Sequence, residues 1–232
     1  MEVPRHITII MDGNGRWAKK QGKKRLFGHN AGAESVRACC EYAVECGIQY
    51  LSLFAFSEEN WSRPQDEING LMELMLKSVL GERETFRRNN IRFRVIGDRS
   101  HLSDKLLENI DMVQGETASH TGLTLIVMLS YSGKWDILQA ARRYAADCLA
   151  AGKELPLDET VFEGYLSTAG IPEPDLLIRT SGEQRISNYM LWQCAYTEFW
   201  YTPVLWPDFR KKDLQQAIDD FNKRERRYGK VE

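Results

Sequence analysis

The sequence predicts an α/β fold, a single domain with a mostly parallel central sheet flanked by helices. Three observations predict it. Short runs rich in Val, Ile, Leu and Phe recur along the chain and are typical of buried strands. Segments with helical patterning separate these runs, so successive strands are expected to lie parallel. The chain has 232 residues, 43% of them hydrophobic, which suits one domain or at most two small ones. We expect one domain spanning 1–232.

The expected elements alternate in order along the chain. Strands are expected at 6–11, 50–56, 91–96, 123–129, 176–179 and 197–201. Helices are expected at 30–46, over most of 65–89, from 103 toward 119, at 135–151 and at 211–227. Gly47 ends the first helix, Pro64 stands at the start of the second, and Ser103 can cap the third. A glycine-rich loop follows the first strand, and 152–158 reads as a surface loop.

Composition excludes several classes of protein. A net charge of −2 gives no global attraction to nucleic acid. No window is apolar for long enough to span a membrane, and the N-terminal segment lacks the layout of a signal peptide. The five cysteines are odd in number and form no C-x-x-C pair. These features predict a reduced, cytoplasmic protein.

The segment after the first expected strand concentrates charge. Asp12 stands where ligands bind parallel sheets, and Gly13 and Gly15 allow backbone amides to turn toward an anion. Residues 13–33 contain no acidic side chain, and residues 28–32 are expected to open a helix with an anion site at its N-terminus. The cations of this segment are Arg16, Lys19, Lys20, Lys23, Lys24 and Arg25. The set suits a Mg²⁺-bound diphosphate. For the lysines alone, a solvated basic loop is the favoured interpretation.

A competing motif overlaps this segment. Residues 13–18 match the dinucleotide-binding pattern G-x-G-x-x-A after a strand. The match is isolated, because no acidic residue ends the second expected strand where a ribose is held. The sequence also contains no Walker loop and no His/Cys cluster with zinc spacing.

Three further polar segments and one apolar helix stand out along the chain. Residues 56–64 follow the second expected strand and hold an arginine, although for this segment alone an ordinary capped turn before a helix is the slightly favoured interpretation. Residues 178–188 contain two arginines whose planar forks suit phosphate oxygens. Residues 224–229 are basic, which is typical either of a helix end or of an anion site. The helix at 71–80 is apolar on several sides, so it is buried or lines an apolar cavity.

These clusters together resemble the cis-prenyltransferase family, and within it the bacterial undecaprenyl diphosphate synthases (isoprenyl transferases). The resemblance runs from about residue 7 to 229. Its motifs are M-D-G-N-G-R-W at 11–17, G-H-x-x-G at 28–32, F-S-x-E-N-W-x-R-P at 56–64 and I-R-T-x-G-E-x-R-I-S-N at 178–188.

The resemblance implies an activity. Members add isopentenyl diphosphate repeatedly to farnesyl diphosphate, make each new double bond cis, and require Mg²⁺. The product is the precursor of a lipid carrier for cell-wall synthesis. The implied fold contains an elongated hydrophobic tunnel, and the implied assembly is a homodimer. Because the product is a lipid, transient contact with a membrane surface is also expected.

The resemblance also implies residue roles, which we carry over by motif. Asp12 and Asn60 are the expected catalytic residues, and Asp12 and Glu198 the expected metal contacts. The expected allylic diphosphate site is Gly13, Asn14, Gly15, Arg16, Arg25 and His29. Isopentenyl diphosphate is assigned to Arg179, Arg185 and Ser187. Further substrate contacts are Trp17, Ser57, Trp61 and Arg63, with Arg227 and Gly229 reaching across the dimer. Ala55 and Leu123 are expected in the tunnel.

The chain departs from the family pattern at a few positions. S-Y-S-G-K at 130–134 stands where N-Y-G-G-R is expected, Glu58 replaces a smaller residue, and Gln184 replaces a histidine. The D-D-x-x-D signature of trans-prenyltransferases is missing. Three alternatives stay open: a shorter-chain cis-prenyltransferase, a non-catalytic partner subunit of the same fold, and a dinucleotide oxidoreductase.

Overall fold

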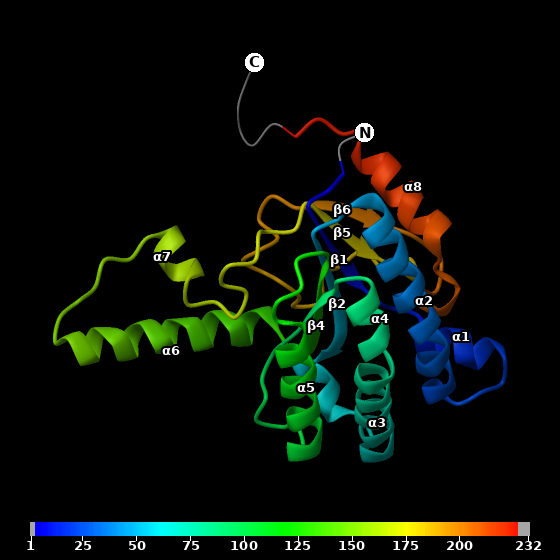
Figure 1. Ribbon diagram of the computed structural model, residues 1–232, viewed down its shortest axis with the longest axis horizontal. Coiled ribbons are helices and arrows are strands. Elements are labelled where there is room, and N and C mark those ends of the chain that lie inside the picture. Colours follow the sequence, from blue (N-terminus) through cyan, green and yellow to red (C-terminus); the bar gives the residue numbers. More distant parts are fainter. Residues whose placement is uncertain (1–2, 227–232) are drawn as a thin grey trace.

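Six strands form one sheet in the computed structural model, which describes residues 3–226 (Figure 1). The strand order is β3-β4-β2-β1-β5-β6, and every neighbouring pair is parallel. The strands are β1 His6–Ile10, β2 Tyr50–Ser57, β3 Arg92–Ile96, β4 Thr124–Tyr131, β5 Leu176–Arg179 and β6 Glu198–Tyr201. The carboxyl ends of all six strands therefore lie at one edge of the sheet.

Helices connect the strands. The α-helices are α1 Asn14–Lys20, α2 Arg25–Cys46, α3 Gln65–Gly81, α4 Arg83–Arg88, α5 Asp104–Thr117, α6 Gly133–Ala151, α7 Glu159–Glu163 and α8 Lys211–Phe221. Two short 3-10 helices, η1 Glu58–Ser62 and η2 Trp206–Asp208, lie near the carboxyl edge of the sheet. Among the described residues, no helix combines the length and apolarity needed to cross a membrane.

The two faces of the sheet are covered differently. Ile7 and Ile9 of β1 pack in one core cluster with residues of α2, α3 and α8. Ile10 belongs to a second cluster, built with Tyr189, Met190 and other residues of the irregular segment 186–194. Alternation along the strand explains the division, because neighbouring side chains point to opposite faces. The face that packs against α2, α3 and α8 is the one that holds the site described below.

Helix α6 extends sideways from the body of the molecule and carries α7 with it (Figure 1). Only the beginning of α6 is buried, at Gly133, Asp136 and Ala140. Its far end exposes Leu149, with 83% of the residue accessible.

The sequence predicted the fold class correctly. Every expected strand is present, with ends that differ by at most two residues. The segment 65–89 divides into α3 and α4 at Glu82, the terminal helix already ends at Phe221, and α7 was not foreseen. The expected glycine-rich loop was wrong in part, because residues 14–20 form α1.

Helix α2 begins at Arg25 and not at residue 30. The start of this helix was expected too late in the chain because Gly28 and Gly32 look like helix breakers. Here they serve packing: a Cβ on Gly28 would lie 2.0 Å from the carbonyl oxygen of Asn14. Helix α1 therefore lies against α2 only because these positions lack side chains. The expected anion site at a helix N-terminus in 28–32 is also wrong, since these residues lie inside α2.

Candidate active site

Asp12 is fixed at the carboxyl end of β1 by its own backbone. Its N–H donates to Oγ1 of Thr180 at 2.9 Å, and the same hydroxyl donates to the Asp12 carbonyl oxygen at 2.6 Å. The backbone N–H of Trp206 donates to that carbonyl at 3.0 Å. Strands β1 and β5 are neighbours, so Thr180 arrives beside Asp12 although 168 residues separate them.

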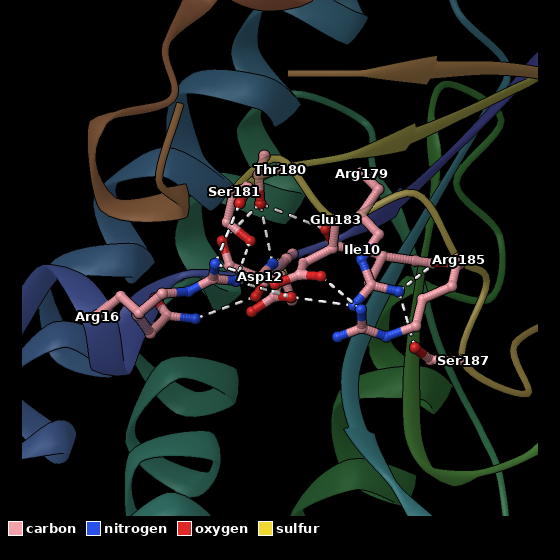
Figure 2. Close-up of polar contacts among 11 residues, drawn as sticks. Ile10, Asp12, Arg16, Arg179, Thr180, Ser181, Glu183, Arg185 and Ser187 are labelled. Carbon is pink, nitrogen blue, oxygen red and sulfur yellow. Dashed lines mark hydrogen bonds and ion pairs between the residues drawn. The ribbon is translucent and has the colours of Figure 1, made fainter. Parts of the chain in front are cut away.

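The carboxylate of Asp12 lies between two arginines. Its Oδ2 is 3.0 Å from Nη2 of Arg179 and 3.3 Å from Nη2 of Arg16. Figure 2 shows these two side chains approaching Asp12 from opposite sides. Burial acts to raise the pKa of Asp12, but the hydrogen bond and charge of Arg179 and the charge of Arg16 outweigh it and lower that pKa. Asp12 is therefore a carboxylate at neutral pH.

Residues 13–17 form the start of α1 beside this carboxylate. Gly13 has φ +108° and precedes α1, and a Cβ there would come within 2.9 Å of Leu205. A Cβ on Gly15 would lie 3.1 Å from the guanidinium carbon of Arg25. Trp17 faces away from the cavity: its indole N–H donates to Asp208 at 2.7 Å, and its ring stacks on Phe27. Trp17 thus holds α1 in place.

Arg25 and Arg63 share one carboxylate. Oε1 of Glu67 lies 3.2 Å from Nε of Arg25 and 3.1 Å from Nη1 of Arg63. His29 lies beside them, where burial and the nearby positive charge of Arg63 lower its pKa to about 4. His29 is therefore neutral at pH 7 and can offer either one donor or one acceptor to a ligand.

A second group of cations surrounds Arg179, whose side chain is 4% exposed. Its Nη1 donates to Oγ of Ser187 at 2.7 Å and also to the carbonyl oxygen of Arg185. Glu183 pairs with both Arg185 and Arg16, the latter at 3.1 Å (Figure 2). The structure thus joins Arg16, Arg179, Arg185 and Ser187 to Asp12 in one connected group of polar contacts, and their roles in substrate binding stay predictions.

The loop after β2 is held by its own polar groups. Oδ1 of Asn60 accepts the backbone N–H of Ser57 at 3.2 Å. The indole N–H of Trp61 donates to Oγ of Ser130 at 2.7 Å, and Ser130 in turn donates to Glu58. Two of the departures from the family pattern, Glu58 and Ser130, therefore contact each other and support Trp61.

A cavity of about 670 Å³ begins at this polar cluster and continues between the sheet, α2 and α3. Its apolar walls include Leu53, Ala55, Leu125, Val127, Leu71 and Met75. The predicted site residues that line it are Asp12, Asn14, His29, Ala55, Ser57, Asn60, Arg63, Arg179 and Ser187. Leu123 is buried in the core two residues before Leu125 and is not among the described lining residues.

Three buried polar atoms at this end find no hydrogen-bond partner within residues 3–226. They are Oδ1 of Asn14, Nε2 of His29 and Nε of Arg179. Since buried polar groups are almost always paired in folded proteins, such atoms at a cavity wall point to a polar ligand. The same cavity is apolar further in, and Arg63 and Arg179 line its polar end, so it suits a ligand with an anionic head and an apolar tail.

The structure does not bring every predicted residue to the site. Glu198 pairs in register with Leu176, and Leu176 with Ile7, so it lies at the amino end of the sheet. Asp12 lies at the carboxyl end, and Glu198 instead pairs with Arg224 at 2.7 Å. Within one chain Glu198 therefore does not lie beside Asp12, and its metal contact stays a prediction. Arg227 and Gly229 lie outside the described residues.

A divalent metal fits Asp12 by its chemistry. Mg²⁺ prefers oxygen ligands and is commonly held by one or two carboxylates together with substrate phosphates. Asp12 offers an ionised carboxylate that is 29% exposed and lines the cavity. In the described part of the chain, one group of three potential metal ligands occurs, Glu58, Asp98 and His101, and Asp12 does not belong to it.

Sequence reasoning missed the residues that position the arginines. Glu67 and Glu183 pair with the arginines, and Thr180 holds the backbone of Asp12 between them. Only Glu67 left a usable signal, since it stands four residues after Arg63 on a helix, the spacing at which opposite charges meet.

The fold and the site define a class of protein. It is a parallel α/β protein that binds an anion through arginines and a carboxylate, with an apolar cavity for the rest of the ligand. The chain belongs to the prenyltransferase family, because a family model described as "Putative undecaprenyl diphosphate synthase" matches residues 10–229.

Similar proteins align with this chain over almost its whole length. A ditrans,polycis-undecaprenyl-diphosphate synthase, (2E,6E)-farnesyl-diphosphate specific, from Coxiella burnetii is 50% identical over 98% of this chain and 96% of its own length. The Escherichia coli K12 protein of that description is 47% identical over 98% of this chain and 90% of its own. The solved lavandulyl diphosphate synthase from Lavandula x intermedia, in complex with dimethylallyl diphosphate, is 36% identical with a TM-score of 0.94, covering 98% of this chain and 99% of that one.

Proposed function

We propose that this chain condenses isopentenyl diphosphate repeatedly with farnesyl diphosphate and forms a long-chain cis-polyprenyl diphosphate of the undecaprenyl type. The observation that carries the proposal is one continuous cavity with a cationic end at Arg179 and an apolar interior. A dinucleotide oxidoreductase does not suit this arrangement, because residues 14–18 of the glycine motif lie inside the short α1, which packs on α2.

The reaction makes and breaks bonds in a defined way. The allylic C–O bond of farnesyl diphosphate breaks and diphosphate leaves with the electron pair. The double bond of isopentenyl diphosphate attacks the allylic carbon, a new C–C bond forms, and a proton is lost from the adjacent carbon. Negative charge grows on the leaving diphosphate, so fixed cations stabilise the transition state. The apolar walls exclude water, which otherwise captures the carbocation.

The site residues divide between the two diphosphates in this proposal. Gly13–Arg16, Arg25 and His29 hold the diphosphate that leaves. Arg179, Arg185 and Ser187 hold the one that stays. Asp12 lies between these groups and orders Arg16 and Arg179. Asn60 and Arg63 position the reacting ends at the mouth of the cavity.

We propose Mg²⁺ as the cofactor, held by Asp12 together with diphosphate oxygens. When bound there, it supplies positive charge to the departing diphosphate. We also propose a homodimer in the cytoplasm, with Arg227 and Gly229 reaching the partner's diphosphate. Transient contact with a membrane surface is expected because the product is a lipid. Sedimentation of the purified chain tests the dimer.

A shorter product is the second candidate. The observation that favours it is the likeness to the lavandulyl diphosphate synthase, a protein of this fold that was solved in complex with the short substrate dimethylallyl diphosphate.

One experiment separates these possibilities. Purified chain is incubated with farnesyl diphosphate, labelled isopentenyl diphosphate and Mg²⁺, and the products are resolved by reverse-phase chromatography. Long-chain products confirm the proposal, and short ones support the second candidate. No product from the chain alone, with activity restored by a second subunit, would instead identify a partner subunit.

A further inference from the structure

Three potential metal ligands meet outside the cavity, at the carboxyl edge of the sheet. Glu58 begins η1 directly after β2, and Asp98 and His101 lie in the loop after β3. One donor atom of each lies within 4.8 Å of the other two. None of the three is among the residues that line the cavity in the described chain. The group is therefore separate from the Asp12 site, and the proposed reaction gives it no role.

The main chain brings the loop after β3 against the end of β4. Gly97 has φ +147°, and a Cβ there would lie 1.8 Å from the carbonyl oxygen of Leu129. The N–H of Asp98 donates to the carbonyl oxygen of Ser130 at 2.8 Å. The hydroxyl of Ser130 donates to Glu58, so one residue of β4 contacts both segments that carry a carboxylate. The approach of the three ligands thus rests on main-chain contacts as well as on side-chain positions.

Neither carboxylate of this group has a basic partner. Among residues 3–226, no lysine or arginine forms an ion pair with Glu58 or Asp98, and Arg99 pairs with Asp111 instead, at 2.6 Å. The imidazole of His101 makes no hydrogen bond or ion pair to either carboxylate in the same part of the chain. Two half-buried carboxylates side by side repel each other unless a cation compensates them. The arrangement therefore lacks a positive charge.

An imidazole nitrogen with two carboxylate oxygens is a mixed donor set that suits a divalent transition metal. Zn²⁺ takes histidine nitrogen and carboxylate oxygen at about 2.0–2.2 Å, often with three protein ligands and one water. Mg²⁺ and Ca²⁺ prefer oxygen alone, so the histidine selects against them. Ligands of one zinc ion stand roughly 3–4 Å apart, so shifts of about 1 Å at the side-chain ends bring the three donors to bonding distance. The exposed ring of His101 has room for such a shift.

Two of the residues involved depart from the family pattern. Glu58 stands where a smaller residue is expected, and Ser130 stands where asparagine is expected. The first supplies a ligand, and the second holds that ligand through its hydroxyl. One metal ion thus accounts for both departures.

We propose that Glu58, Asp98 and His101 bind one divalent transition metal ion, with Zn²⁺ as the expected metal. This ion fastens η1 to the loop after β3 and is distinct from the Mg²⁺ proposed at Asp12. Since η1 carries Asn60, the ion also steadies a residue assigned to positioning the reacting ends. That consequence rests on the proposed function, whereas the metal site does not.

Calorimetric titration of the metal-free chain with Zn²⁺ tests the site. Diphosphates are left out, because the Asp12 site depends on their oxygens. Wild type should bind Zn²⁺, and Glu58→Gln, Asp98→Asn and His101→Gln should each weaken this binding by roughly tenfold or more. Asp12→Asn should bind Zn²⁺ as the wild type does. Equal binding by the wild type and the three ligand variants, or no binding by the wild type, would overturn the site.

The matched control is His120→Gln. The ring of His120 bonds the carbonyl oxygen of Ile91 at 2.8 Å, beside the start of β3, whereas His101 follows the end of that strand. His120→Gln should keep the wild-type affinity for Zn²⁺. Zn²⁺ should also raise the unfolding temperature of the wild type and of His120→Gln but not of His101→Gln, because a ligand that binds only the folded chain stabilises it. The opposite pattern would assign the ion to another place.

A second measurement looks for the gain of a signal. Asp98→Cys brings a thiolate of nearly the same length into the donor set, and Co²⁺ replaces Zn²⁺ as a spectroscopic probe. Thiolate bound to Co²⁺ absorbs in the near ultraviolet, so this band should appear in Asp98→Cys and be missing from the wild type. Asp111→Cys, at an exposed position of α5, is the control and should show no band. Equal spectra of the two cysteine variants would overturn the site even where Asp98→Asn loses Zn²⁺ by misfolding.

The same preparations separate this inference from the proposed function. A wild-type chain that binds Zn²⁺ at these residues but forms no polyprenyl product refutes the function and leaves the metal site standing. A chain that forms the product and binds no Zn²⁺ overturns the metal site alone.

Discussion

Asp12 shows how one side chain is specified by residues distant in sequence. Its backbone is held by Thr180 and its carboxylate by Arg16 and Arg179. Since these partners keep Asp12 ionised, its negative charge is a permanent part of the site. Removing the charge without removing the side chain is the cleanest test of its role.

We expect Asp12→Asn to lower kcat/KM by roughly 10²–10³, the loss typical of one preorganised charged contact. Steady-state kinetics with farnesyl and isopentenyl diphosphates measure it. Glu116→Gln on the surface serves as the control and should retain wild-type activity. Wild-type activity in Asp12→Asn would remove Asp12 from the mechanism.

The motifs identified most of this site, because residues such as Arg179 and Ser187 carry their own signal in the sequence. The residues that support these side chains carry no such signal. Thr180 acts through a contact that depends on strand order, and no local pattern reveals strand order. The separation of Glu198 from Asp12 within one chain also follows from strand order and direction, and the metal contact of Glu198 stays a prediction.

At the scale of elements, α1 and α2 are joined by glycines. The contact between Gly28 and the carbonyl of Asn14 leaves no space for a side chain. The strands were predictable from hydrophobic runs, and the start of α2 was not, because a glycine inside a helix looks like a terminus. The cost of filling that contact can be measured directly.

We expect Gly28→Ala to lower the free energy of unfolding by roughly 3 kcal/mol, since its Cβ meets backbone and not a movable side chain. Gly115→Ala is the matched control, a helical glycine in α5 with open space around it. It should raise stability by about 0.5–1 kcal/mol. Urea denaturation of both variants measures the difference, and equal effects would contradict the packing argument.

Glu67 of α3 holds Arg25 of α2 and Arg63 of the preceding loop. We expect Glu67→Gln to weaken farnesyl diphosphate binding by about tenfold, the equivalent of one charge-assisted hydrogen bond. Calorimetric titration measures it. Glu73→Gln on the same helix removes an exposed pair with Lys77 and should leave binding unchanged. The role of Glu67 is disproved if both variants bind as the wild type does.

At the scale of the whole molecule, stability depends on groups that must stay neutral. His6 is fully buried, where its ring bonds to Ser52 and to the carbonyl of Pro172, each at 2.7 Å. Burial lowers the pKa of His6 from 6.5 to about 4. The unfolded chain therefore binds more protons than the folded one between these two values.

Stability should consequently fall as pH decreases from 6.5 to 4. His6 alone accounts for about 3 kcal/mol of that loss. His6→Asn should reduce the difference in unfolding free energy between pH 6.5 and 4 by about this amount. Between pH 7 and 8 His6 is neutral in both the folded and the unfolded chain. The unfolding free energies of the variant and the wild type should therefore differ by the same amount throughout that range. An unchanged acid dependence in His6→Asn would contradict the assignment.

The neighbour relation of β1 and β5 also affects how the protein is made. β1 is synthesised first but occupies the middle of the sheet, and one of its edges pairs only with β5, about 170 residues later. A chain emerging from the ribosome therefore carries an unpaired strand edge through most of translation. Asp12 meets Arg179 only after that edge closes, so a nascent chain acquires the ability to bind diphosphate late, in the step that also ends its exposure to aggregation.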